Sequence, residues 1–106
     1  MSQLIEVHFT SGSLDEARRI ARYLVQERLV ACAQIIPWIE SVYLWDQKME
    51  TAQESKVVLK TTESLYSKVE EVILQNHSYE VPELLIFPIQ GGTEAYLEWL
   101  QETIKA

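Results

Sequence analysis

The chain has 106 residues, the size of a single domain with one hydrophobic core, so we expect one domain over residues 1–106. Its 16 acidic and 9 basic residues give a formal net charge of −7, which opposes binding to nucleic acid or anionic lipid, because both need a basic surface. A single cysteine excludes an internal disulfide, and no stretch has the pattern of a leader peptide or a membrane span, so we expect a cytoplasmic protein with no membrane partner.

The first expected elements are a strand and a helix. Residues 3–10 alternate between apolar and polar types, as in a half-buried strand. The spacing of Ser13 and Glu16 predicts a capping box, in which the serine accepts from the first turn and the glutamate reaches back to the cap amide. The helix that follows should end near Arg28 or Leu29. Its apolar face is predicted to hold Leu14, Ala17, Ile20, Ala21, Leu24 and Val25.

The middle of the chain predicts a β-hairpin. The segment from Ala33 to Trp45 is rich in β-branched and aromatic residues. Pro37 lies inside it and marks an edge strand or a bulge, because proline has no amide hydrogen for the strand ladder. Residues 46–48 are expected to form the turn, and residues 56–60 the returning strand.

The last part predicts a helix, a short buried strand and another helix. Thr61 or Thr62 is expected to cap the first of these helices, and the strand should span residues 84–89. The final helix should begin at Thr93. The whole order is β-α-β-β-α-β with an added C-terminal helix, which indicates an α+β, ferredoxin-like sandwich. The apolar faces of the two helices are predicted to hold Leu65, Val69, Val72 and Ile73, and Leu97, Leu100 and Ile104.

Aromatic side chains are concentrated on the predicted hairpin. Trp38, Tyr43 and Trp45 lie there, and Trp99 lies on the last helix. These rings either fold back onto their own sheet or are buried between copies of the chain. Large exposed rings promote aggregation and aromatic residues gather at interfaces, so we expect a homo-oligomer.

The loop from Asn76 to Glu83 holds the densest group of reactive side chains. A histidine, a tyrosine and two glutamates follow one another between a helix and a buried strand. Loops on a rigid scaffold often carry binding residues. This loop could bind a cation, receive a small polar ligand, or only shape a turn.

Four segments of the chain, taken in order, resemble the CutA family of divalent-cation tolerance proteins. They are Leu29–Pro37, Ser41–Trp45, Leu59–Thr61 and His77–Glu83, and the likeness is collinear from Ile5 to Leu100. The resemblance implies a ferredoxin-like subunit in a tight homotrimer whose strands pair across subunits, as in PII signalling proteins. It also implies tolerance of copper and other heavy-metal ions. The chain departs from the family pattern at Phe9, Gln34, Trp38, Asn76 and Ser78.

His77 is the leading candidate ligand for a divalent metal ion, with copper the first choice, because neutral imidazole suits copper, nickel and zinc. Further ligands would have to come from Glu80, Glu83 or another copy of the chain. The alternative is a loop histidine bonded to backbone or water. On this hypothesis the protein binds metal weakly as part of a response to copper.

A second hypothesis is a PII-like signalling trimer. Lys60, Tyr79, Glu80, Glu83 and Trp45 would line a cleft between subunits and bind a small anionic ligand. The alternative is a structural cluster in which Lys60 pairs with Glu80 or Glu83. The partner protein is not indicated by the sequence.

Several other features point away from catalysis. His8 is expected to be an ordinary strand residue, and Cys32 a buried structural thiol without a base beside it. The acidic pairs at residues 15–16 and 70–71 are expected to lie on solvated helix faces. The glycines at 91 and 92 lack the following lysine of a phosphate-binding loop, and no zinc spacing occurs. We therefore do not expect an enzyme.

Overall fold

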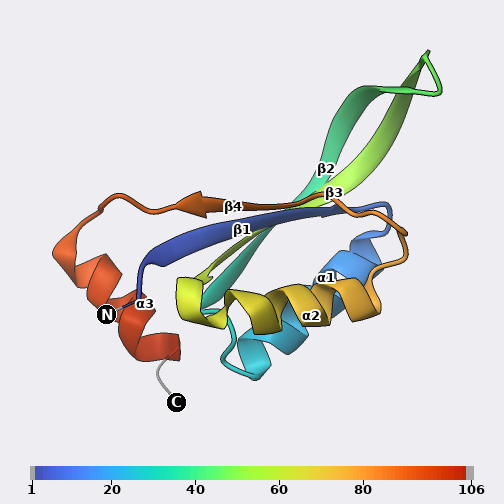
Figure 1. Cartoon of the computed structure of the whole chain (residues 1–106). Coiled ribbons are helices and arrows are strands. Elements are labelled where there is room, and N and C mark those ends of the chain that lie inside the picture. The colour runs from blue at the N-terminus through green and yellow to red at the C-terminus, as the bar shows by residue number, and fades with distance from the viewer. Residues whose placement is uncertain (1, 105–106) are drawn as a thin grey trace.

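The computed structural model describes residues 2–104 and forms one sheet covered by helices (Figure 1). Three α-helices, one 3₁₀ helix and four strands occur in this part of the chain. This is the α+β class expected from the sequence. In chain order the elements are β1 (Leu4–Ser11), α1 (Leu14–Gln26), β2 (Cys32–Trp45), β3 (Lys48–Thr62), η1 (Glu63–Leu65), α2 (Tyr66–Asn76), β4 (Leu84–Pro88) and α3 (Glu94–Ile104).

The sheet is antiparallel throughout, with strand order β2-β3-β1-β4. Helices α1 and α2 lie side by side on one face of it (Figure 1). The alternation predicted for β1 is confirmed, because Ile5, Val7 and Phe9 are at most 1% exposed and face these helices. The core that they share with the helices also contains Ala17, Ile20, Ala21, Leu24, Val30, Val57, Leu59, Val69 and Ile73.

Helix α1 buries Ala17, Ile20, Ala21 and Leu24 of its predicted apolar face, but Val25 is 40% exposed. The helix ends at Gln26, short of the expected Arg28. Arg28 has a φ of 58°, the left-handed conformation that stops a helix. The amides of Arg28 and Leu29 then donate to the carbonyls of Val25 and Leu24. These bonds satisfy the end of the helix and turn the chain toward β2.

Pro37 lies in a bulge of β2, which is also an edge strand, as expected. Ile36 pairs with Lys56 and Ile39 pairs with Glu54, so two residues of β2 stand opposite Ser55 alone. The Ser55 hydroxyl donates to the Pro37 carbonyl over 2.8 Å. That bond holds the bulge.

The hairpin continues beyond the bulge as a two-stranded ribbon, residues 39–54, which we call the arm. Strand β3 begins at Lys48 rather than at the expected residue 56, because the arm is paired along its whole length. Asp46 and Gln47, with φ of 51° and 64°, make the tight turn at its tip. Figure 1 shows the arm projecting from the body. The radius of gyration is accordingly 14.6 Å, against about 13 Å for a compact chain of this length.

The start of α2 corrects another expectation. The 3₁₀ turn precedes it, and neither Thr61 nor Thr62 caps it with a side chain. The Thr61 hydroxyl instead donates to the Leu29 carbonyl over 2.6 Å, because Thr61 points into the core. Helix α3 begins one residue after Thr93 and packs on the end of the sheet. Its residues Leu100 and Ile104 form a second apolar cluster there with Leu4 and Ala31.

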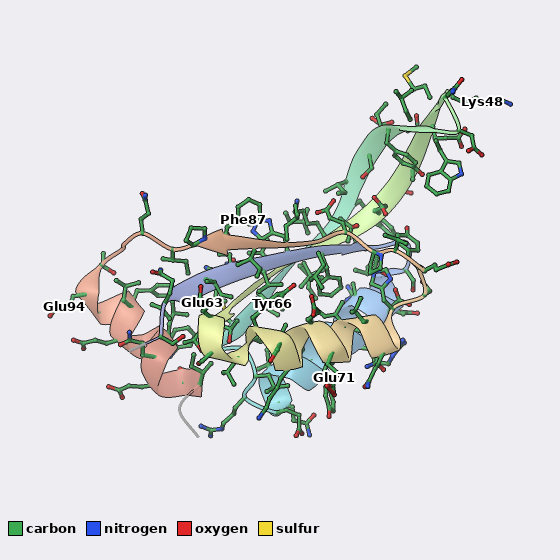
Figure 2. The ribbon with its side chains drawn as sticks, in the orientation of Figure 1. Lys48, Glu63, Tyr66, Glu71, Phe87 and Glu94 are labelled. Carbon is green, nitrogen blue, oxygen red and sulfur yellow. The ribbon has the colours of Figure 1, made fainter. Side chains whose placement is uncertain are left out.

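The face of the sheet opposite α1 and α2, and the arm, carry large exposed apolar side chains. Leu44, Trp45 and Met49 near the tip of the arm are 74%, 68% and 74% exposed. Phe87 on β4 lies on the side of the sheet away from α2 (Figure 2). Within one chain the hairpin tryptophans therefore do not fold back onto the sheet. In residues 2–104 no helix has the length and apolar character needed to cross a membrane.

Candidate functional site

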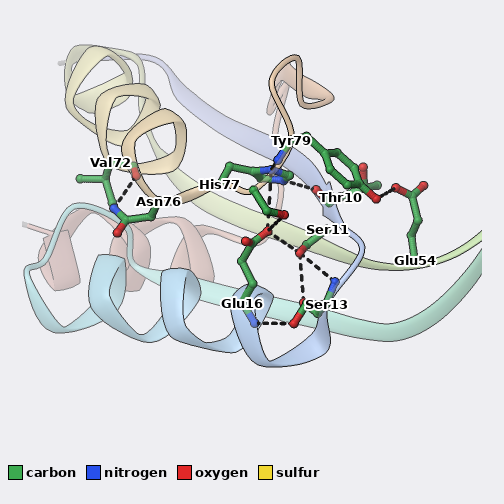
Figure 3. A network of polar contacts seen from close by, with 10 residues as sticks. Thr10, Ser11, Ser13, Glu16, Glu54, Val72, Asn76, His77 and Tyr79 are labelled. Carbon is green, nitrogen blue, oxygen red and sulfur yellow. Dashed lines mark hydrogen bonds and ion pairs between the residues drawn. The ribbon is translucent and has the colours of Figure 1, made fainter.

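His77 follows the last residue of α2 and points inward against β1 (Figure 3). Its Nε2 lies 2.6 Å from the Thr10 carbonyl, and its Nδ1 accepts from the Tyr79 amide over 3.0 Å. A carbonyl only accepts, so Nε2 carries the proton and the imidazole is neutral. The side chain has no exposed surface. Both ring nitrogens therefore bond to backbone groups, which agrees with the alternative of a loop histidine bonded to backbone.

Glu16 lies beside His77 and is 7% exposed, so the expectation of a solvated face is wrong for this residue. Its Oε2 accepts from the hydroxyls of Ser11 at 2.7 Å and Ser78 at 3.2 Å. The same oxygen is 3.7 Å from His77 Nδ1. A buried carboxylate needs such donors, because burial without them is costly. Glu16 therefore joins β1, α1 and the loop after α2.

The predicted capping box forms only in half. The Ser13 hydroxyl accepts from the Glu16 amide over 3.2 Å, as expected. The Glu16 carboxylate does not reach back to Ser13, because it is bound to the two serine hydroxyls. The Ser13 amide donates instead to the Ser11 hydroxyl, at 3.1 Å.

Tyr79 extends the network from the loop to the hairpin. Its hydroxyl donates to Glu54 Oε2 over 2.8 Å, and the other oxygen of Glu54 accepts from Ser41 at 2.6 Å. Burial and the Glu54 carboxylate raise the pKa of Tyr79 from 10.0 to about 12. Gly12 lies beneath the ring, where a Cβ would be 2.8 Å from the tyrosine oxygen. A larger residue at position 12 would displace this side chain.

The remaining residues proposed for a cleft lie apart within one chain. Glu83 pairs with Lys56 at 3.7 Å, and Glu80 is exposed on the loop. Trp45 is at the tip of the arm, well away from the loop (Figure 1). One chain alone does not bring these residues together with Lys60. A shared cleft made by several copies stays a prediction.

Lys60 lies near α3, on the sheet face that α1 and α2 leave uncovered. Its Nζ donates to the Tyr96 hydroxyl over 3.2 Å and lies 5.3 Å from the centre of that ring. Burial is the largest influence and lowers the pKa of Lys60, but the Tyr96 hydroxyl, Cys32 and Glu6 outweigh it, so the pKa lies above its usual value. The alternative in which Lys60 pairs with Glu80 or Glu83 is not formed within residues 2–104 of one chain, and a pairing between copies stays a prediction.

The contacts of His8 and Cys32 are those of residues with a structural role. His8 Nε2 lies 2.9 Å from Glu6 Oε1, and its ring packs on Phe87 with centroids 4.3 Å apart. Cys32 is half-buried rather than fully buried, with its sulfur 4.0 Å from the Tyr96 hydroxyl. Within residues 2–104, the Cys32 sulfur has no imidazole or carboxylate among its hydrogen-bond partners, and the His8 ring has no hydroxyl or thiol.

The fit of a metal ion at His77 can be judged from its neighbours. An imidazole that donates one N–H to a carbonyl is oriented as metal-binding imidazoles usually are. The other nitrogen, Nδ1, lies 3.7 Å from the Glu16 carboxylate. The lone pair of Nδ1, however, already accepts from the Tyr79 amide. Within residues 2–104 no three His, Cys, Asp or Glu side chains gather around one point. A metal therefore does not fit here without displacing that amide.

The sequence reasoning missed Glu16 and Glu54 as members of this network. A signal was available for Glu16, because Glu16, Ile20 and Leu24 are spaced four apart and so share the buried face of α1. No local pattern indicated Glu54, whose partner is distant in the sequence.

Comparison with known proteins gives one consistent result. A family model described as "CutA1 divalent ion tolerance protein" matches residues 5–103. The chloroplastic protein CutA of Arabidopsis thaliana is 40% identical over 101 residues, 95% of this chain but 56% of that protein, so the chain spans little more than half its length. The divalent-cation tolerance protein CutA of Thermus thermophilus is 41% identical over 96 residues, 91% of this chain and 93% of that protein.

Solved structures agree with the sequence relatives. The crystal structure of CutA1 from Oryza sativa has a TM-score of 0.91 at 40% identity, covering 96% of this chain and 94% of its own. The CutA of Archaeoglobus fulgidus, described as periplasmic, has a TM-score of 0.90 at 33% identity, covering 96% and 99%. The resemblance drawn from the four sequence segments is confirmed.

Proposed function

This chain belongs to the CutA1 divalent ion tolerance family, and on that premise we propose that it acts as a homotrimer in the response to copper and other divalent metal ions. The observation that supports self-assembly is the arm, whose apolar side chains one copy of the chain leaves in solvent. The strand order supports the ferredoxin-like description that we propose for the subunit.

Strand pairing between copies would cover these surfaces. Strands β2 and β4 are the two edges of the sheet, and each has one side without a neighbouring strand in residues 2–104. Exposed strand edges with apolar side chains readily pair with other chains. Burying one large aromatic ring removes roughly 150–250 Å² from water, worth on the order of 4–6 kcal/mol as an upper estimate. The number of three copies comes from the family resemblance.

Sedimentation velocity at micromolar concentration tests the assembly. We expect a species of three times the 12.3 kDa chain mass. The double variant Leu44→Ser/Trp45→Ser should shift the population toward monomer, because it removes apolar contacts at the tip of the arm. Tyr23→Ser is the matched control, since Tyr23 is an exposed ring on α1 and away from the arm. A monomeric wild-type chain would refute the trimer.

We propose weak binding of a divalent ion, copper first, at His77. Two potential ligands support this proposal: the Nδ1 of His77 and the Glu16 carboxylate 3.7 Å away. Binding would be weak because the ion must displace the Tyr79 amide and enter a site with no exposed histidine surface. The ion itself would be the substance that is tolerated rather than a resident cofactor.

Calorimetric titration with Cu²⁺ tests this site. His77→Ala should lose the binding isotherm, while His8→Ala, the change at the other histidine, should retain it. Glu16→Gln keeps the size of that side chain and should weaken binding if the carboxylate is a ligand. Identical isotherms for wild type and His77→Ala would remove His77 from the site. Growth in copper of cells lacking this chain, with and without each variant, tests the physiological role.

A PII-like signalling trimer is the second candidate, and one observation favours it. The ammonium group of Lys60 has no carboxylate partner within residues 2–104, so an anion is free to pair with it. On this proposal Lys60, Tyr79, Glu80, Glu83 and Trp45 meet in a cleft between copies. A thermal-shift screen of anionic metabolites should then give a hit that Lys60→Ala loses and Lys68→Ala on α2 keeps.

We also propose that the chain has no catalytic role. The Ser11 and Ser78 hydroxyls donate to Glu16 and not to His77, so no serine is activated by the imidazole. A cytoplasmic location is proposed from the single cysteine alone.

A further inference from the structure

We propose that the outer face of α1 binds a phosphorylated small molecule of the nucleotide class. The phosphate groups would lie on Arg18, Arg19 and Arg22, and the ring beside Tyr23. This site is on the helical face of the sheet, opposite the surface proposed for self-assembly (Figure 1). It is therefore independent of the function proposed above.

The three arginines form a basic patch on an acidic protein. All are exposed, and their spacing of three and four residues puts them on one face of α1. None forms an ion pair within residues 2–104, although Asp15 lies on the same face. The three arginines and Asp15 together carry a formal charge of +2, whereas the whole chain carries −7. Like charges at this spacing repel each other, and a bound anion would remove that repulsion.

The surface around this patch is hollowed in two adjoining places. One hollow of about 500 Å³ is lined by the three arginines with Asp15, Tyr23 and Gln26. A second, of about 370 Å³, lies in the seam between α1 and α2. Arg19 and Tyr23 line both, so the two hollows are neighbours on the surface. The second hollow is completed by Ile20, Val72, Gln75 and Asn76. Small-molecule sites typically have volumes of about 300–1,000 Å³.

The chemistry of the two hollows differs in a way that selects the ligand. Guanidinium groups bind phosphate oxygens through paired hydrogen bonds, so the first hollow suits phosphates. The second offers the exposed Tyr23 ring and the Val72 side chain to a planar group. The Asn76 side-chain amide already donates to the Val72 carbonyl at 2.8 Å, which leaves its oxygen as an acceptor. A molecule with both phosphates and a hydrogen-bonding ring matches this arrangement.

Calorimetric titration with ATP and with inorganic tripolyphosphate tests the proposal, in the presence of a chelator so that metal ions cannot bridge. We expect both to bind and ATP to bind more tightly. Arg18→Ala/Arg22→Ala should weaken both by at least about tenfold, because two positive groups that would bind phosphate oxygens are removed. Tyr23→Ser should remove only the advantage of ATP.

Lys68→Ala is the matched control, since it removes one positive charge from an exposed position of α2. All of these positions are exposed, so circular dichroism should show unchanged folding. Three results would overturn the proposal: no binding of either probe at millimolar concentration, undiminished binding by the double arginine variant, or an equal loss in Lys68→Ala. Equal affinity for ATP and tripolyphosphate would overturn the nucleotide assignment.

Discussion

The hydroxyl of Tyr79 donates to Glu54 over 2.8 Å, and this bond joins the loop after α2 to β3 where the arm begins. The two residues are far apart in sequence and come from different layers of the fold. The backbone amide of Tyr79 also donates to His77, so both the backbone and the side chain of this loop residue are held in place. The position of the loop and the base of the arm are therefore coupled.

Tyr79→Phe removes only the hydroxyl from this contact. We expect the free energy of unfolding to fall by about 1 kcal/mol, the usual net contribution of one hydrogen bond. Glu54 keeps its bond from Ser41, which limits the loss. Urea denaturation measures the change. Tyr23→Phe, at an exposed position of α1, should have no effect; an equal loss there would show that the Glu54 bond is not the cause.

Gly12→Ala places a Cβ 2.8 Å from the Tyr79 oxygen, closer than two such atoms can approach. The hydroxyl must move away from Glu54, so we expect destabilisation of about 1 kcal/mol, the usual net contribution of the hydrogen bond that is lost. The other atoms of the ring would remain at 3.5 Å, an ordinary contact. Gly12→Ala should therefore cost less in the Tyr79→Phe variant than in the wild type. Strict additivity in the double-mutant cycle would contradict this explanation.

Glu16→Ala removes the carboxylate that accepts from the Ser11 and Ser78 hydroxyls, and Ser11 keeps only the Ser13 carbonyl, at 3.0 Å, as an acceptor. We expect a loss of about 2 kcal/mol in the free energy of unfolding, measured by urea denaturation. Glu71→Ala is the control, because Glu71 is exposed on α2 and points away from the sheet (Figure 2). Its effect should stay within about 0.5 kcal/mol. Similar losses at both positions would mean that Glu16 does not hold the loop.

Stability should decrease at alkaline pH because of two tyrosines. Burial, followed by a neighbouring glutamate, raises the pKa of Tyr66 and of Tyr79 from 10.0 to about 12. Below pH 10 both tyrosines are neutral in the folded and the unfolded chain, so they cause no change of stability with pH there. As pH rises from 10 to about 12 the unfolded chain loses these protons first, so the free energy of unfolding falls.

Unfolding measured across that interval, together with the ultraviolet absorbance of tyrosinate, checks this prediction. The double variant Tyr66→Phe/Tyr79→Phe should flatten much of the decrease. Titration of all five tyrosines at the ordinary value would contradict it.

The order of the elements was predictable because the chain keeps clear periodicities. The alternation of Ile5, Val7 and Phe9 corresponds directly to buried positions, as does the predicted apolar face of α1 except at Val25. The arm was cut short in the prediction because residues 48–54 are mostly polar and have no apolar buried face to generate a pattern. They are strand residues only because β2 pairs with them.

The candidate site was predictable in location but not in its contacts. His77 and Tyr79 are conspicuous in sequence, and the structure places both in one network. Their partners Thr10 and Glu54 are brought to them by the sheet, which no local pattern encodes. The predicted threonine cap failed for a similar reason, since the Thr61 side chain is taken by the core.

The bulge of β2, where Pro37 and Trp38 together stand opposite Ser55, has a consequence for how copies of the chain would meet. A bulge bends and twists a ribbon without changing the pairs on either side of it. Deleting Trp38 would leave Ile39 opposite Glu54 and every later pair of the arm in place. It would alter only the direction in which the arm points. In the proposed assembly, the bulge would therefore set the angle at which the arm of one copy meets its neighbours, while the strand pairs within the arm stay the same.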